Sequence, residues 1–314
     1  MIPSSLLPAR SALDGVIAVP ATPFTEDGRV DVASLRRYVR TFLARGVVGF
    51  LAPAVAGEAE ALTEAERELI VATLIEEAAG RVPVIGGATD PDPAARLRHA
   101  RRFQALGCPG VLASLRYEND AQYAAAVHAL AELNPGFLML QDMDTGVAPL
   151  PVALLARLHR EVPCFTWVKL ETADRCRKLT ALRDAAGPTL HIGTAGPDLL
   201  ELLDRGANAY LPTLYPETYS RIWRLHRAGQ RAAALALYHR LLPGLAFMAT
   251  HQKLQWRFTK AMLHAEGIFA TPRIRVAAPP LDAAEERMIA DLVTHAAGLR
   301  ALAPEPVATP DCIP

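Results

Sequence analysis

The residues of this sequence best suited to chemistry are a lysine and a glutamate in one short apolar run, Phe165-Thr-Trp-Val-Lys169-Leu-Glu171. Side chains alternate between the two faces of a β-strand, so Lys169 and Glu171 are expected on the same face. Burial among apolar neighbours favours the neutral amine, which is the form of lysine that adds to a carbonyl carbon to give a Schiff base. Glu171 is placed to transfer the protons of that reaction. The alternative from this run alone is a strand-end lysine that extends to solvent beside an acidic partner.

Composition argues against several classes of function. The chain has 314 residues, 51% of them hydrophobic, and its 33 basic residues balance 33 acidic ones. No basic run with interleaved aromatic residues and no glycine-rich nucleotide loop appears, so nucleic acid and nucleotide cofactors are not expected as ligands. The 4 cysteines and 9 histidines lack metal-binding spacing, so we expect no metal. Without a signal peptide or a run near the roughly 18 apolar residues of a membrane span, we expect a cytoplasmic protein.

Short apolar runs recur at the spacing of βα units, and segments with helical periodicity lie between them. The helical segments begin at typical N-terminal signals, such as Asp31 and the Thr63-Glu-Ala-Glu66 capping box. Eight strands that alternate with helices predict an α/β fold, a parallel (β/α)8 TIM barrel whose active site lies at the C-terminal strand ends. The expected strands are Val16–Val19, Val48–Leu51, Val82–Ile85, Gly110–Ala113, Phe137–Gln141, Phe165–Leu170, Thr189–Ile192 and Ala207–Leu211.

The strand pattern stops after about Arg227, and a C-terminal extension of three helices is expected to follow the barrel. Turns at Thr271-Pro272 and Ala278-Pro-Pro280 separate helical patterns in this region. The predicted helices are Gln230–Leu242, Leu245–Glu266 and Asp282–Leu302. The predicted organisation is therefore a barrel that carries the active site (1–228), a helical extension (229–303) and a proline-rich tail expected to be flexible (304–314).

A loop that precedes a helix follows the second expected strand, with the sequence Ala54-Val55-Ala56-Gly57-Glu58. Free backbone N–H groups in such a loop can hold an anion such as a carboxylate. The common alternative is a glycine that only turns the chain. Val55, Ala56, Gly57 and Glu58 are candidate substrate-binding residues on the first interpretation.

Four motifs together resemble the dihydrodipicolinate synthase / N-acetylneuraminate lyase family, and the likeness runs from about Gly15 to the third C-terminal helix. The resemblance implies a (β/α)8 barrel with a C-terminal helical appendage, usually assembled as a homotetramer. It also implies a Schiff base between a sixth-strand lysine, here Lys169, and a 2-oxo acid, with no cofactor. The motifs are Gly15-Val-Ile-Ala-Val-Pro-Ala-Thr22-Pro23-Phe24, Gly57-Glu58-x-x-x-Leu62-Thr63, Thr145-Gly146 and Val168-Lys169-x-Glu171.

The chain departs from the family pattern at three places. Ala54-Val55-Ala56 replaces the usual Gly-Thr-Thr, which removes two hydroxyl groups that contact substrate in the family. The fifth strand, which ends in Leu138-Met-Leu-Gln141-Asp142, lacks the family's proton-relaying tyrosine. Asp144 stands where the family usually has an arginine.

Within the family, the chain is most similar to the L-2-keto-3-deoxyarabonate dehydratase branch. The likeness rests on Met139-Leu-Gln141-Asp142 followed by Lys169-Leu-Glu171-Thr172. That branch also lacks the tyrosine and is thought to use the lysine and the nearby glutamate. The resemblance therefore implies Glu171 as the acid/base group. The Asn or Ser residues of that branch's substrate loop are Val55 and Gly57 here, which leaves the exact substrate open.

Several further residues are candidates for the site, each with a structural alternative. Tyr117 matches a family tyrosine that often reaches a neighbouring subunit's site, or it is a surface tyrosine. Asp142 orients a substrate hydroxyl or caps a turn. Tyr210 narrows the pocket or packs in the core. Gln141, at the end of the fifth strand, and Thr194, just after the seventh, are also expected to bind substrate.

The sequence thus predicts a Schiff-base lyase acting on a 2-oxo acid, and more narrowly a dehydratase of a 2-keto-3-deoxy sugar acid. One rival is an aldolase that uses the same imine. The other is a degenerate family member that binds a ligand without turnover, which the combined loss of Thr, Thr, Tyr and Arg favours and the retention of Lys169 and Glu171 opposes. A homo-oligomer, either a dimer or a tetramer, is expected.

Overall fold

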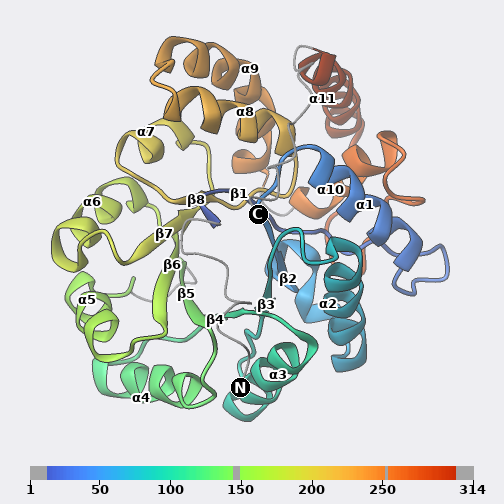
Figure 1. Cartoon of the computed structure of the whole chain (residues 1–314). Helices are drawn as coiled ribbons and strands as arrows, with labels where there is room; N and C mark the ends of the chain where they lie inside the picture. The colour runs from blue at the N-terminus through green and yellow to red at the C-terminus, as the bar shows by residue number, and fades with distance from the viewer. Residues whose placement is uncertain (1–12, 144–148, 252–253, 302–314) are drawn as a thin grey trace.

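The computed structural model describes residues 13–143, 149–251 and 254–301, and these contain a closed barrel of eight parallel strands (Figure 1). The strands follow one another around the ring in chain order, from β1 to β8 and back to β1. This arrangement confirms the predicted TIM-barrel fold. The strands are β1 (Gly15–Ala18), β2 (Gly49–Ala52), β3 (Val84–Gly87), β4 (Gly110–Ser114), β5 (Phe137–Met143), β6 (Phe165–Glu171), β7 (His191–Thr194) and β8 (Ala209–Tyr210).

The barrel is a packed core because each strand is buried on both of its faces. Alternate residues point inward, and their side chains fill the interior of the barrel. The opposite residues pack outward against the helices and join one large outer core. The inner core contains Ile17, Leu51, Ile85, Leu112, Met139, Trp167 and Leu211.

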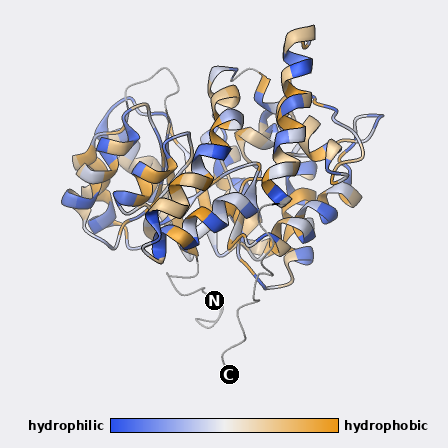
Figure 2. Ribbon diagram, turned by 90° about the horizontal axis from the view of Figure 1, so that it is seen from above, coloured by the Kyte–Doolittle hydropathy of each residue, from blue (hydrophilic) through white to orange (hydrophobic). Residues whose placement is uncertain are grey.

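The helices that follow the strands surround the barrel (Figure 1). Ribbon colouring by hydropathy shows hydrophobic and hydrophilic residues mixed along these helices, as expected when one face packs on the strands (Figure 2). Asp31 caps the first helix, and Thr63 and Glu66 form the predicted capping box of the second. The helices are α1 (Val32–Ala44), α2 (Glu64–Ala78), α3 (Pro93–Leu106), α4 (Asp120–Ala131), α5 (Val152–Glu161), α6 (Arg175–Ala186), α7 (Leu199–Asp204) and α8 (Pro216–Arg227).

Three helices follow the barrel in the described part of the chain, but their predicted bounds are wrong at two places. The predicted helix Leu245–Glu266 is not continuous, because one helix ends at Thr250 and the next begins at Gln255. The chain was expected to break at Pro243, whereas α9 (Arg231–Thr250) continues through it. Proline removes one helical hydrogen bond, and here packing outweighs that loss because Gly244 lies directly against Tyr215. The next helices are α10 (Gln255–Ala265) and α11 (Ala283–Ala301). The predicted tail 304–314 lies outside the described residues.

Helix α9 is long and rich in apolar residues. By length and composition alone, it is the one helix of the described ranges that could cross a membrane. In the fold it packs against α8 and α11 at the outside of the barrel. Its apolar residues are interrupted by Arg231, His239 and Arg240.

The close approach of two strand ends requires a glycine at position 87. A Cβ atom on Gly87 would lie 1.8 Å from the carbonyl oxygen of Pro53, and that backbone atom cannot move aside easily. We expect Gly87→Ala to lower the free energy of unfolding by about 1–3 kcal/mol or more. Urea unfolding of the purified protein measures this change. Gly298→Ala is the control, because nothing lies within 4 Å of a Cβ there, and it is expected to be neutral or slightly stabilising. Equal stability of the two variants would contradict the packing argument.

Candidate active site

Three polar side chains meet at the C-terminal mouth of the barrel. Lys169 and Glu171 both point inward from β6, and the Lys169 Nζ atom lies 3.0 Å from Glu171 Oε2. Gln141 stands opposite Lys169 in the register of β5 and β6. Its Nε2 atom donates a hydrogen bond of 2.6 Å to the same Glu171 oxygen. The structure therefore brings together three residues that the sequence proposed for the site.

The surroundings of this cluster suit proton transfer next to an amine. The Lys169 side chain is 8% exposed and lies above the apolar inner core, while Glu171 is 20% exposed at the mouth. A carboxylate in contact with a lysine amine can accept a proton from an atom one or two bonds away from that nitrogen. Gln141 occupies the end of β5, where the family pattern has a tyrosine. Its amide can hold the carboxylate in place, but it does not titrate.

Three other predicted substrate-binding residues point away from the barrel interior. Each of them directly precedes or follows a residue that faces inward, and strand alternation sends it to the opposite side. The Asp142 carboxylate lies 2.7 Å from Lys178 Nζ of α6 and accepts a hydrogen bond from the backbone of Leu150. Both members of that pair are buried, so Asp142 links β5 to α6 and does not face the barrel interior.

Thr194 and Tyr210 are likewise directed outward, so the structure does not place them where the sequence analysis expected. The Thr194 hydroxyl donates to the carbonyl of Leu170 over 2.9 Å. The Tyr210 ring packs against Tyr219 with the two ring planes tilted, and its hydroxyl hydrogen-bonds the backbone of Gly196. Burial raises the pKa of the Tyr210 phenol well above its usual value. The inward positions beside them are taken by small or apolar residues, including Gly193 and Leu211.

The loop after β2 lies at the mouth, with Ala54 and Ala56 packed against the inner core. Val55, Ala56 and Gly57 form a single 3-10 turn, and the Val55 side chain is half exposed. The Gly57 N–H donates to the Ala54 carbonyl over 2.9 Å, so it is not free for a ligand. The N–H groups of Val55 and Ala56 take no partner among the described residues.

The structure removes Glu58 from the predicted set of substrate contacts. Its side chain is fully buried and turns away from the barrel towards the C-terminal helices. The Glu58 carboxylate pairs with Lys260 of α10 and accepts backbone N–H bonds from Arg275 (2.6 Å) and Val276 (2.8 Å). A carboxylate with these partners is not available to bind a small molecule.

Tyr117 lies in the segment that follows β4, and its hydroxyl donates to Asp120 at the start of α4 over 2.9 Å. This hydrogen bond raises the pKa of the Tyr117 phenol. Its ring lies edge-on to Tyr123, with centroids 6.1 Å apart. The role of Tyr117 in a neighbouring subunit's site stays a prediction. Asp144, Thr145 and Gly146 lie outside the described residues.

Three residues near the site were missed by the sequence analysis because they come from distant parts of the chain. Trp256 of α10 donates from its indole N–H to the Val55 carbonyl over 3.0 Å. Thr22 donates to the Gly57 carbonyl over 2.6 Å, and Lys260 pairs with Glu58. A lysine among the apolar residues Phe258, Met262 and Leu263 was a usable signal for Lys260. In the described parts of the chain, no three His, Cys, Asp or Glu side chains are placed to hold a metal ion.

The chain matches one family model and is similar to several known proteins. The family model of the Dihydrodipicolinate synthetase family matches residues 12–296. The chain is 29% identical over 283 residues to L-2-keto-3-deoxyarabonate dehydratase of Azospirillum brasilense, covering 85% of this chain and 89% of that protein. It is 27% identical over 301 residues to 4-hydroxy-tetrahydrodipicolinate synthase of Methylobacterium radiotolerans, covering 91% and 96%. The crystal structure of dihydrodipicolinate synthase from Rhodopseudomonas palustris shares the fold, with a TM-score of 0.85 at 24% identity, covering 92% and 99%.

The outward position of Asp142 leads to a prediction about stability. Asp142→Ala leaves the Lys178 ammonium buried without its partner, so we expect the free energy of unfolding to fall by about 3–5 kcal/mol. The double variant Asp142→Leu/Lys178→Met removes both charges and is expected to recover most of this loss. Chemical denaturation of the single and double variants measures both effects. A single variant as stable as the unmodified protein would show that the pair does not hold β5 and α6 together.

Proposed function

This chain belongs to the dihydrodipicolinate synthetase family of lyases, and from that premise we propose that it is a Schiff-base lyase that dehydrates a 2-keto-3-deoxy sugar acid. The observation that carries the proposal is the contact of 3.0 Å between Lys169 Nζ and Glu171 Oε2 at the barrel mouth. The similarity to the Azospirillum brasilense dehydratase supports the choice of substrate class. The N–H groups of Val55 and Ala56, for which the described ranges provide no acceptor, are the donors that we assign to the substrate carboxylate.

In the proposed reaction, the neutral amine of Lys169 adds to the C2 carbonyl carbon, and loss of water with uptake of one proton from solvent gives a protonated imine. The positive imine draws electrons from the C3–H bond, and Glu171 takes that proton to leave an enamine. The enamine electrons then expel the C4 hydroxyl, which takes up a proton from solvent and leaves as water, while Glu171 returns the C3 proton to solvent. Hydrolysis of the imine returns Lys169 and releases the dehydrated product. The imine itself is the electron sink, so no cofactor is required.

The position of Glu171 favours dehydration over aldol cleavage. In the imine, C3 is two bonds from Lys169 Nζ, and the Glu171 carboxylate already contacts that nitrogen. Dehydration needs a base at the C3 proton, whereas cleavage of the C3–C4 bond needs a base at the more distant C4 hydroxyl. Gln141 occupies the position on β5 opposite Lys169 and carries no titratable group for that second task. An aldolase that uses the same imine is the second candidate function, and it would release aldol fragments in place of the dehydrated product.

Borohydride reduction tests the covalent step. We expect incubation with pyruvate and borohydride to give one stable adduct by intact mass, and Lys169→Ala to give none, because the secondary amine forms only on the reacting nitrogen. The chain contains four lysines, Lys169, Lys178, Lys253 and Lys260, so peptide mapping assigns the adduct without ambiguity. Circular dichroism of Lys169→Ala controls for folding. Trapping that persists in a folded Lys169→Ala protein would move the nucleophile to another residue.

Turnover of the Glu171→Gln variant tests the proton transfer. This variant is expected to keep the borohydride adduct and to lose kcat by roughly two to four orders of magnitude, because glutamine cannot take the C3 proton. The assay follows release of the dehydrated product from 2-keto-3-deoxy sugar acids, with aldol fragments measured in parallel. Glu118→Gln changes an exposed glutamate after β4 and is the matched control, with turnover expected to be unchanged. Normal turnover in Glu171→Gln would assign the proton to another group, and aldol fragments would favour the aldolase.

A further inference from the structure

Glu58 and Lys260 form an enclosed ion pair between the loop after β2 and helix α10, and the proposed reaction does not use either side chain. Both side chains have 0% of their surface exposed. The Lys260 ammonium also donates to the carbonyl of Arg273 over 2.7 Å and lies 4.1 Å from the centre of the Phe24 ring. Glu58 adopts a left-handed backbone conformation with φ of 58°, which a residue other than glycine keeps only when its surroundings hold it there.

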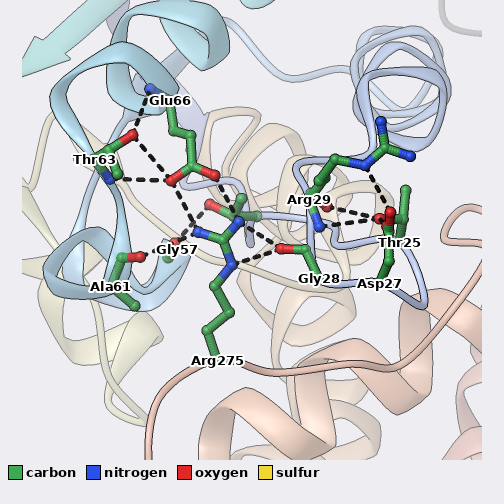
Figure 3. Close-up of polar contacts among 10 residues, drawn as sticks. Thr25, Asp27, Gly28, Arg29, Gly57, Ala61, Thr63, Glu66 and Arg275 are labelled. Atoms are coloured by element: carbon green, nitrogen blue, oxygen red, sulfur yellow. Dashed lines mark hydrogen bonds and ion pairs between the residues drawn. The ribbon is translucent and has the colours of Figure 1, made fainter.

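A second ion pair lies next to the first and ties the same C-terminal segment to the barrel. Figure 3 shows the Arg275 guanidinium between the carbonyls of Gly28 and Ala61 and the carboxylate of Glu66. The hydrogen bonds from Arg275 lower the pKa of Glu66 to about 2, so this carboxylate stays charged. The backbone N–H of Arg275 is in turn one of the donors to Glu58. The segment that carries Arg275 is thereby fixed on both sides.

Besides Glu58, two residues of the loop, Val55 and Gly57, accept hydrogen bonds from other segments of the chain. Trp256 of α10 bonds the Val55 carbonyl, and Thr22 bonds the Gly57 carbonyl. A Cβ atom on Gly57 would lie 2.7 Å from the carbonyl oxygen of Pro20, so the loop sits tightly on the segment after β1. Helix α10 therefore contacts the loop twice, through Trp256 at its start and through Lys260 one turn later.

A buried ion pair usually stabilises a fold no more than two apolar side chains of similar size would. Removing two charges from water costs free energy that their attraction repays only in part, and apolar replacement of both is often neutral or stabilising. Burial lowers the pKa of Lys260 to about 8, the nearby positive charge of Arg275 acts in the same direction, and the carboxylate of Glu58 opposes both. The pair does, however, define one geometry, since the Glu58 carboxylate must meet three donors at once.

We propose that Lys260, acting through Glu58, is a positioning residue that holds the loop 54–58 in the conformation that accepts the carboxylate of the 2-oxo acid. This inference rests on the proposed function, because it concerns the affinity of the site that forms the imine. It makes the C-terminal helix α10 part of the binding apparatus although no side chain of α10 takes part in the chemistry. Loss of the pair is expected to weaken substrate binding and to leave the covalent step intact.

The experiment is a titration of borohydride trapping with pyruvate. For Lys260→Met we expect the half-saturating pyruvate concentration to rise about three- to tenfold, the loss expected for one substrate hydrogen bond, while the adduct reaches the same plateau. Hydrogen exchange of the Gly57 and Glu58 amides is expected to quicken in the same variant. Arg45→Met is the matched control: it breaks an ion pair with Glu266 just after the other end of α10 and is expected to leave the half-saturation unchanged.

A double variant separates positioning from stability. Glu58→Leu/Lys260→Met removes both buried charges and is expected to unfold at a higher urea concentration than Lys260→Met, which leaves the Glu58 carboxylate buried without its partner. Its half-saturating pyruvate concentration should nevertheless stay raised, because no carboxylate remains to meet the donors from 275 and 276. Two results would overturn the positioning role alone. One is a half-saturating pyruvate concentration in the double variant equal to that of the unmodified protein, and the other is an unchanged value in a folded Lys260→Met protein. Absence of any adduct in the unmodified protein would overturn the proposed function and this inference together.

The pH dependence of pyruvate binding tests whether Lys260 acts on the site through its charge. A pair that only stabilised the fold would not change the half-saturating pyruvate concentration with pH. Above pH of about 8 Lys260 loses its proton, and its attraction for Glu58 weakens while Arg275 remains paired with Glu66. The ratio of half-saturating concentrations between Lys260→Met and the unmodified protein is therefore expected to be largest below pH 8 and to fall towards one above it. The ratio cancels any pH dependence of imine formation itself, which both proteins share. A ratio that is constant from pH 6 to 10 would contradict the inference.

Discussion

The rest of the site depends on the alternation of side chains along the strands of a closed parallel barrel. Two adjacent strands in register place every second residue on the same inner surface. Because Gln141 pairs with Lys169 in the register of β5 and β6, its amide, the Lys169 amine and the Glu171 carboxylate converge at one mouth. The same alternation sends Asp142, Thr194 and Tyr210 to the outer surface, where they bond helices and neighbouring backbone. One geometric rule thus decides which polar residues of the strand ends face the mouth of the barrel.

The lysines within the described residues, Lys169, Lys178 and Lys260, each pair with a carboxylate, and access to the mouth distinguishes their roles. Lys178 with Asp142 and Lys260 with Glu58 are closed pairs whose members are at most 5% exposed. Lys169 differs because its partner Glu171 is 20% exposed at the open end of the barrel. A closed pair can fix one arrangement of elements, whereas a pair with an open side can exchange its partner for a substrate. The contact between an amine and a carboxylate is therefore not sufficient by itself to identify a catalytic site.

The wall of the mouth is assembled from parts of the chain that lie far apart in sequence. The loop after β2 supplies Ala54 and Ala56 to the inner core, but α10 and the segment around Arg275 hold it from outside. This explains how a loop that has lost the hydroxyl side chains of its family can keep a defined shape. Its conformation is imposed by the buried Glu58–Lys260 pair and by carbonyl hydrogen bonds, while Ala54, Val55 and Ala56 contribute only apolar side chains.

The sequence by itself determined the barrel, its capping signals and the shared face of Lys169 and Glu171, since these follow from periodicity and spacing within short segments. The alternation of side chains along β5 and β8 can be inferred from the sequence in the same way. Applied to Asp142 and Tyr210, it would have predicted that both side chains point outward. The continuation of α9 through Pro243 and the capture of Glu58 by Lys260 were decided only by tertiary structure. Both depend on packing between segments far apart in the chain, and local pattern carries no information about which distant group will meet a given side chain.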